Sequence, residues 1–297
     1  MNKSTLRLGF LIWILSSTTH LWAQNLTVGI TLHPYYSYVS QVLGEHGQVL
    51  PLIESGFNPH NYELQPADLR RLTQLDALVV NGIGHDEFAL HALEHLDLPR
   101  LTVIHANRDV PLLRYGQGNM SVNPHTFVAI DAAIRQIYTI AAELGRLDPA
   151  HAAAFQQNAL RYARHLRQIK NHYRTQIMAL DLTQVRIAST HNAYGYLLQE
   201  FGIGIDTVIE PAHGVEPSAT QLQDTIRRIQ QAQIQVLFTE LDLDHRYVDV
   251  IEQATGIRIY HFSHMTHGAY SADLVEREMR HNLETLVQAL TYAAEAR

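Results

Sequence analysis

The segment LDPAHAAAFQQNALRYARHLRQIKNHYRTQIMALDLT, residues 147–183, lies near the middle of the chain and determines how its two halves are connected. Apolar side chains recur along it at helical spacing, at Phe155, Ala159, Tyr162, Leu166, Ile169, Tyr173, Ile177 and Leu180. Asp148 fits the N-cap of such a helix and Pro149 its first turn. Roughly 30 residues at about 1.5 Å each give a rod of about 45 Å. The segment predicts one rigid helix over residues 148–181, with a coiled coil as the alternative.

Short β-branched runs alternate with helical patterns on both sides of this segment. Strands are expected at residues 26–32, 48–54, 76–82 and 100–106 before it, and at 185–190, 235–241 and 257–262 after it. A helix beginning near Ser218 has the capping-box pattern Ser218-x-x-Gln221. Such alternation is typical of largely parallel sheets covered by helices. We therefore expect an α/β fold with an N-terminal lobe at residues 24–147 and a C-terminal lobe at 182–297, joined by the long helix.

The first residues, MNKSTLRLGFLIWILSSTTHLWAQ, have the pattern of a secretory signal peptide. Lys3 and Arg7 precede an apolar run at residues 8–15, which is too short to span a bilayer as a stable helix. We expect cleavage after Ala23, which removes residues 1–23. The chain has no cysteine, so it can form no disulfide and carry no lipid on an N-terminal thiol. The sequence predicts a soluble, periplasmic protein without a membrane anchor.

The composition limits the partners that the protein can have. Lys and Arg total 22 and Asp and Glu total 29, a balance of −7. This charge predicts neither a basic stripe for nucleic acid nor a polybasic segment for an anionic membrane. The 19 histidines stand out beside the absence of cysteine. A transition-metal site in this chain has to be built from imidazole and carboxylate.

The tripeptide Asn-Pro-His occurs twice, at residues 58–60 and 123–125. Proline fixes its own φ near about −65° and orders the turn that presents the next side chain. A third histidine, His191, lies at a strand-to-helix junction of the second half, where open α/β sheets bind their ligands. His60, His125 and His191 could therefore offer three neutral imidazoles, the usual nitrogen donors for zinc. For each histidine taken singly, a helix cap on the surface is the alternative interpretation.

Several of these segments resemble, in order, those of the zinc- and manganese-binding solute-binding proteins of bacterial ABC transporters. The longest are GFNPHNYELQPADLRRLTQLDALVVNGIGHDEF, NPHTFVAIDAA and THNAYGYLLQEFGI, followed by VEPSATQL, VLFTE and REMRHNLETL. The resemblance covers residues 26–292, including the long helix. It implies a two-lobed periplasmic receptor in which His60, His125 and His191 are the first three metal ligands.

The sequence departs from the pattern of this family at the fourth ligand. The family usually takes an Asp or Glu from the loop after the last expected strand, but Ser263 stands at that position and cannot supply a carboxylate. His264 is the expected substitute, with His261, His267 or a water as alternatives. We expect Glu240, in LFTELD, to orient a histidine rather than to bind metal. The long His- and acid-rich loop of many zinc-binding members is also missing.

The sequence therefore predicts a monomeric receptor that captures a divalent transition metal and delivers it to an inner-membrane ABC permease without catalysing a reaction. Zn²⁺ is expected rather than Mn²⁺, because nitrogen in place of a carboxylate oxygen favours zinc. The alternative is an exported zinc hydrolase that uses the same histidines, with Glu63 or Glu240 as the base.

The pentapeptide HALEH, residues 91–95, fits the His-x-x-Glu-His pattern of one metallopeptidase class. His91 and His95 lie four residues apart, so a helix places them on one face. Pro99 ends the segment soon afterwards, and no third ligand follows at a suitable spacing. We therefore expect a surface helix.

Overall fold

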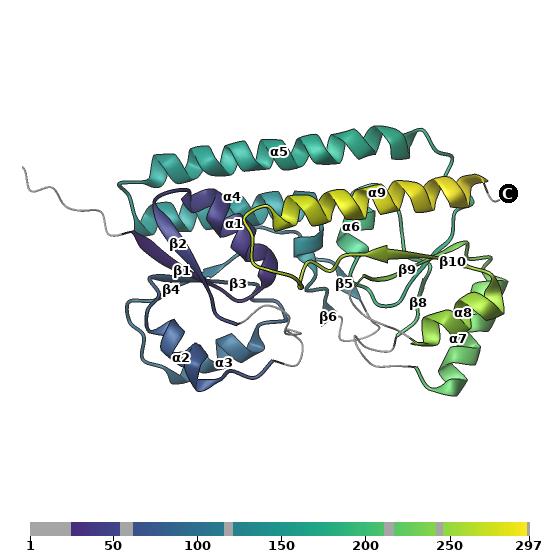
Figure 1. The fold of residues 1–297 in the computed structure, drawn as a ribbon, viewed down its shortest axis with the longest axis horizontal. Helices are drawn as coiled ribbons and strands as arrows, with labels where there is room; N and C mark the ends of the chain where they lie inside the picture. Colours follow the sequence, from purple (N-terminus) through teal and green to yellow (C-terminus); the bar gives the residue numbers. More distant parts are fainter. Residues whose placement is uncertain (1–24, 54–61, 116–120, 211–216, 242–245, 296–297) are drawn as a thin grey trace, which may run out of the picture.

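The structure is a computed structural model that describes residues 25–53, 62–115, 121–210, 217–241 and 246–295. Two separate four-stranded sheets lie at opposite ends of an elongated molecule, and long helices run above both of them (Figure 1). The expected two-lobed α/β class is confirmed.

The first sheet is entirely parallel, with the strand order β2-β1-β3-β4. Its strands are β1 (Leu26–Ile30), β2 (Gly47–Pro51), β3 (Ala77–Val80) and β4 (Thr102–His105). They are connected by α1 (His33–Leu43), α2 (Pro66–Leu72) and α3 (Glu87–His95). Helix α1 has Pro34 in its first turn, where proline fits, and Gly44 at its C-cap. Gly44 has a φ of 58°, which glycine adopts at low cost.

The second sheet is also parallel, with the order β10-β9-β7-β8. Its strands are β7 (Ile187–Ser189), β8 (Thr207–Val208), β9 (Val236–Glu240) and β10 (Arg258–Phe262). Its helices are α6 (Gly195–Gln199), α7 (Ala219–Gln231) and α8 (Arg246–Thr255). The capping box expected at Ser218 and Gln221 is formed, because each side chain bonds the backbone N–H of the other residue. This box fixes the start of α7.

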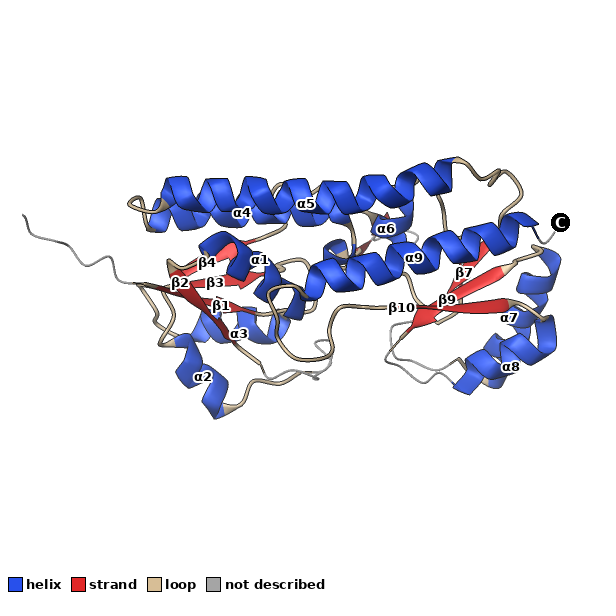
Figure 2. Cartoon of the chain, turned by 45° about the horizontal axis from the view of Figure 1, so that its top comes forward, coloured by secondary structure: helices blue, strands red, loops and turns tan. Residues whose placement is uncertain are grey.

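Three long helices cover the upper side of both sheets: α4 (Ile130–Leu147), α5 (Ala152–Met178) and α9 (Leu274–Glu295). Helix α5 extends along both lobes (Figures 1 and 2). One continuous core contains buried side chains of β1, α5, β7 and α9, such as Val28, Phe155, Ile187 and Leu283. One core cluster therefore spans both lobes, and each lobe has a further cluster of its own on the other face of its sheet.

The start of the long helix differs from the sequence prediction. Asp148 is not its N-cap: Asp148 ends α4, and α5 begins at Ala152 with His151 at the N-cap position. The Asp148 carboxylate lies 2.6 Å from Nδ1 of His151. Residues 148–151 therefore form the turn between α4 and α5, although helical spacing predicts one helix over 148–181.

The segment that follows β10 crosses back to the N-terminal lobe before α9 begins. Tyr270 donates a hydrogen bond from Oη to the carbonyl of Ile53 (2.9 Å), and its ring stacks on His33 at 4.1 Å. Ser37 of α1 donates from Oγ to the carbonyl of Ser271 (2.8 Å). This segment is thus fixed to α1 although it starts in the C-terminal lobe.

Two short strands, β5 (Arg114–Tyr115) and β6 (Ser121–Val122), pair antiparallel shortly before the second Asn-Pro-His motif. In the described part of the chain, no helix is both long and apolar enough to span a membrane.

Candidate metal centre

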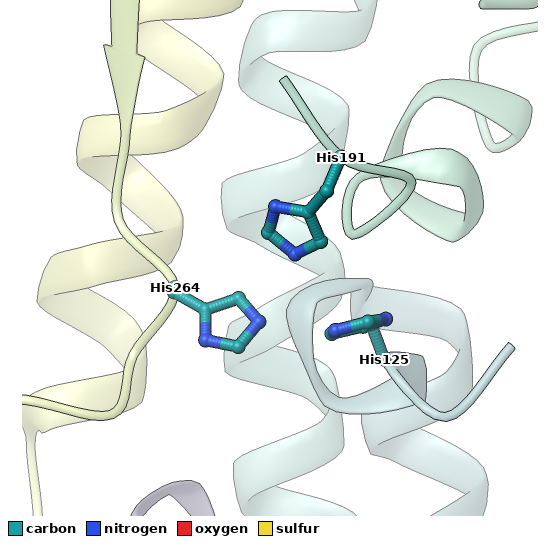
Figure 3. Close-up of side chains that lie close together, drawn as sticks. All are labelled: His125, His191 and His264. Carbon is teal, nitrogen blue, oxygen red and sulfur yellow. The ribbon is translucent and has the colours of Figure 1, made fainter. Parts of the chain in front are cut away.

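Three buried histidines from distant parts of the chain converge between the two lobes. His125, His191 and His264 each bring one ring nitrogen to within 4.8 Å of the other two. Their ring centroids are 5.0 to 5.6 Å apart. Figure 3 shows the three rings turned toward a common space. Among the described residues, this is the only group of three or more His, Cys, Asp or Glu side chains that meets so closely.

The second Asn-Pro-His motif fixes the ring of His125. The side-chain oxygen of Asn123 accepts a hydrogen bond from the backbone N–H of His125 (3.0 Å) and lies 2.8 Å from its Nδ1. Because Nδ1 faces this acceptor, Nε2 is the nitrogen that a metal would use. Asn123 also donates from Nδ2 to the carbonyl of Asn192 (2.7 Å), the residue after His191. The motif therefore ties the two lobes together at the site.

The position of His191 follows from parallel strand pairing in the second sheet. His191 comes just after β7, and Glu240 is the last residue of the neighbouring strand β9. Parallel strands bring their carboxyl ends to one edge, and there Glu240 Oε1 lies 2.9 Å from Nδ1 of His191. Both side chains are buried, with 5% and 2% of their surface exposed. A carboxylate in this position sets the tautomer and orientation of a metal-binding histidine.

The loop after β10 places His264 with the other two histidines. Ser263 is held by Asn282: its N–H donates to Oδ1 (2.7 Å) and its carbonyl accepts from Nδ2 (2.9 Å). The hydroxyl of Ser263 accepts from the N–H of Met265 (3.0 Å). The position where the family pattern has a carboxylate therefore shapes the loop, and the next residue reaches the centre.

The remaining candidates from the sequence lie elsewhere. His60 falls outside the described residues. His261 is exposed on β10, and His267 is half-buried beside Thr266. Glu63 is exposed near the start of α2, and His91 and His95 are exposed on α3. The structure thus brings together three of the four expected ligands and separates the HALEH pair from them.

His85 lies beside this centre, and the sequence interpretation missed it. Its side chain is buried, and its ring centroid is 4.5 Å from that of His125 and 6.3 Å from that of His264. His85 stands in NGIGHDEF, where it has no motif of its own. Its place after the carboxyl end of β3, where open sheets bind ligands, is the signal that could have revealed it.

A buried polar network supports the loops that carry His85 and His125. Asn81 accepts hydrogen bonds at Oδ1 from Tyr35 Oη (2.6 Å) and Asn107 Nδ2 (2.7 Å). It donates from Nδ2 to the carbonyls of Gly84 (2.8 Å) and Pro124 (3.1 Å). Buried polar groups paired in this way make the surrounding backbone rigid. The two histidine loops are therefore held as one unit.

The fold and the site define a class of two-lobed solute-binding proteins, and sequence comparison identifies the family within it. Residues 28–289 match the family described as the periplasmic component A of the zinc-uptake complex, ZnuA. The chain belongs to this family, which confirms the resemblance found in the sequence.

Similar proteins are described with different metal ions. The chain is similar to the SBP FpvC of Pseudomonas aeruginosa, solved with Ni²⁺ (45% identity over 90% of this chain and 97% of that chain, TM-score 0.85). A second FpvC structure contains Mn²⁺ (44% identity, 90% and 99% covered, TM-score 0.86). The high-affinity zinc uptake system protein ZnuA of Bacillus subtilis is 22% identical over 246 residues, which cover 79% of this chain and 76% of the relative.

Proposed function

We propose that this protein is a periplasmic receptor that captures one divalent transition metal ion, preferentially Zn²⁺, and delivers it to an inner-membrane ABC permease. The observation that carries the proposal is the buried meeting of His125, His191 and His264 from both lobes. Family membership supports the transport role, because the family is named for zinc uptake.

The proposed ligands are the Nε2 atoms of His125, His191 and His264, with His60 as the fourth. His60 is assigned from its Asn-Pro-His motif and the family resemblance. Zinc–nitrogen bonds of about 2.0–2.1 Å place neighbouring nitrogens of a tetrahedral site about 3.4 Å apart. The ring nitrogens within 4.8 Å of one another can reach this geometry by small side-chain rotations.

The donor set favours zinc over manganese. Four imidazoles provide no carboxylate oxygen, and manganese is a harder ion that prefers oxygen ligands. The order of stability for nitrogen sites also places Zn²⁺ well above Mn²⁺. Ni²⁺ should compete with zinc for nitrogen ligands more strongly than Mn²⁺ does. Because FpvC was solved with Ni²⁺, nickel should be tested beside manganese.

A receptor explains the centre better than a hydrolase does. A zinc hydrolase needs an open metal position and a general base beside it. Of the two base candidates, Glu63 is exposed and Glu240 faces Nδ1 of His191, the side of the ring away from the proposed metal nitrogen. The proposal therefore assigns no catalysis to the centre.

The proposal also includes export by cleavage after Ala23 and action as a monomer without a membrane anchor. It keeps the division into lobes at residues 24–147 and 182–297, with the long helix between them. Sequencing the mature N-terminus and measuring the mass in solution test the first two points.

Competition titration at neutral pH tests the choice of metal. Metal-free protein is titrated with Zn²⁺ in the presence of equal Mn²⁺ or Ni²⁺, and the bound metal is measured. We expect Zn²⁺ to remain bound against both ions. Displacement of zinc by an equal concentration of either ion would overturn the zinc assignment.

A further inference from the structure

His85 is a fourth histidine, among the described residues, at the metal centre. Neither the sequence motifs nor the family resemblance assigns it a role. Its ring meets that of His125 edge-to-face at 4.5 Å and that of His264 at 6.3 Å. It is not one of the three histidines whose ring nitrogens all lie within 4.8 Å of one another. His85 therefore lies beside the proposed site but is not one of its proposed ligands.

The backbone at His85 adopts a conformation that side chains rarely take. Its φ is 75°, in the left-handed region, where a non-glycine residue is uncommon. Such conformations persist only where the surroundings impose them, and they concentrate at functional sites. Here the surroundings are Asp86, whose Oδ1 accepts from the N–H of Gly82 (3.1 Å), and Asn81, which donates to the carbonyl of Gly84. The strained backbone directs a buried imidazole toward His125.

The loop of His85 also packs directly on the motif that carries His125. A Cβ at Gly84 would lie 2.9 Å from Cβ of Pro124, closer than atoms can approach without a shift. Glycine at this position therefore lets the two loops come into contact. The Asn81 side chain donates to the carbonyls of Gly84 and Pro124, so one side chain holds the backbone of both loops.

His85 lies on the N-terminal side of the centre, beside the ring of His125 and on a loop that Asn81 bonds to the His125 motif. His125 lies in the N-terminal half, and the segment after His264 is fixed to α1 through Tyr270 and Ser271. His191, in contrast, is held by Glu240 of the second sheet. If the His191 side chain withdraws from the ion, His85 is a further buried imidazole beside His125 and His264.

We propose that His85 is an exchange ligand, which binds the ion during entry and release in the place of His191 while His125 and His264 stay bound. One metal–nitrogen bond forms as another breaks, and both donors are neutral imidazoles, so the charge of the site does not change. The ion then never has to pass through a state with only two imidazoles from the described part of the site. This inference rests on the proposed function, because it requires that the centre bind metal.

The test measures zinc exchange in two variants that remove the imidazole. His85→Asn keeps a residue that tolerates the left-handed backbone, and His85→Gly removes the strain altogether. Stopped-flow transfer of Zn²⁺ from the full-length protein to a fluorescent chelator gives the release rate, and mixing metal-free protein with Zn²⁺ gives the binding rate. His91→Asn, on the exposed face of α3, is the matched control.

We expect both rates to fall about tenfold in both His85 variants, equal to ~1.4 kcal/mol in activation free energy. The dissociation constant should change little, because binding and release slow together. Unchanged rates would overturn the proposal. Faster release with weaker affinity would also overturn it, because it would make His85 a resident ligand or a positioning residue. A difference between Asn and Gly would assign the effect to the backbone instead.

The same experiment separates this inference from the proposed function. If the wild-type protein binds no zinc, the proposed function fails. If the wild type binds zinc and the His85 variants exchange it at the wild-type rate, only the exchange role fails.

Discussion

The molecule has two groups of histidines that differ in their burial and in their separation along the chain. His91 and His95 lie one helical turn apart on α3 and are exposed, whereas His125, His191 and His264 are far apart in the chain and buried together. The exposed pair gives the more obvious local pattern. The buried group has rings held by Asn123 and Glu240, so its nitrogens already face one another. The difference teaches that spatial convergence and anchoring, more than sequence spacing, define a metal site.

The largest effect should come from removing one of the buried rings. A structural zinc site contributes about 10–16 kcal/mol in total, so each of four ligands contributes about 2.5–4 kcal/mol. We expect His125→Ala and His191→Ala each to weaken zinc binding by about 10²–10³-fold, measured by titration against a chelator. His91→Ala and His95→Ala are the matched controls and should bind like the wild type. If zinc binding required His91 and His95 but not His191, the exposed pair rather than the buried group would be the metal site.

A smaller effect should follow from changing the residue behind a ring. Glu240→Gln keeps the shape of the side chain but removes the charge beside Nδ1 of His191. Partners of this kind typically contribute 10–100-fold to metal affinity, so we expect roughly that loss in the zinc titration. Glu94→Gln, between the two exposed histidines of α3, should have no effect. Equal affinities for the two variants would show that Glu240 does not act on the site.

A buried histidine should make the unfolding free energy depend on pH in a way that an exposed histidine does not. Burial is the main cause that lowers the pKa of His33 from 6.5 to about 4. The unfolded chain therefore takes up a proton below pH 6.5 that the folded protein binds only near pH 4, and stability is lost as pH falls through this window. The contribution amounts to about 2 kcal/mol at pH 5.

The comparison of His33→Phe with His91→Phe tests this effect. We expect the loss of unfolding free energy between pH 7.5 and pH 5 to shrink in His33→Phe, which removes the titrating group. His91→Phe changes an exposed histidine and should keep the wild-type loss. Chemical denaturation at the two pH values measures both. An unchanged loss in His33→Phe would show that His33 is not held neutral by burial.

The smallest effect concerns the shape of the whole molecule. One core cluster and the helix α5 span both lobes, so metal release should involve small tilts rather than wide opening. Shifts of packed helices are typically about 1–2 Å, and we expect radii of gyration that agree within that range with and without zinc. Small-angle scattering measures them. A change of several ångströms would mean that the core divides between the lobes.

Most of the fold could be predicted because its elements carry strong periodic signals. The strands near Val28, Leu78 and Leu237 are buried runs of β-branched and aliphatic residues, and the long helix repeats its apolar positions without interruption. Short elements gave no such signal: β8 has two residues, as do β5 and β6. The start of α5 was misplaced because Asp148 suits a helix start in sequence, whereas tertiary structure uses it to end α4.

Some residues of the site could also be predicted from the sequence, but from motifs and strand ends rather than from periodicity. His125 stands in a repeated Asn-Pro-His motif and His191 follows a strand of the second sheet, so the repeat could locate the first and the rule for parallel sheets the second. His264 could be inferred only because Ser263 cannot supply a carboxylate. His85 escaped because its nearness to His125 depends on a left-handed backbone and on the contact between Gly84 and Pro124, which no periodicity encodes.

Elemental analysis of the protein purified from the periplasm without added metal tests the central claim most directly. The account predicts one zinc per chain in the wild type and in a control that lacks His91 and His95. It predicts loss of that zinc in a variant with both His125→Ala and His191→Ala. Zinc retained by this double variant, or another metal in the wild type, would contradict the account.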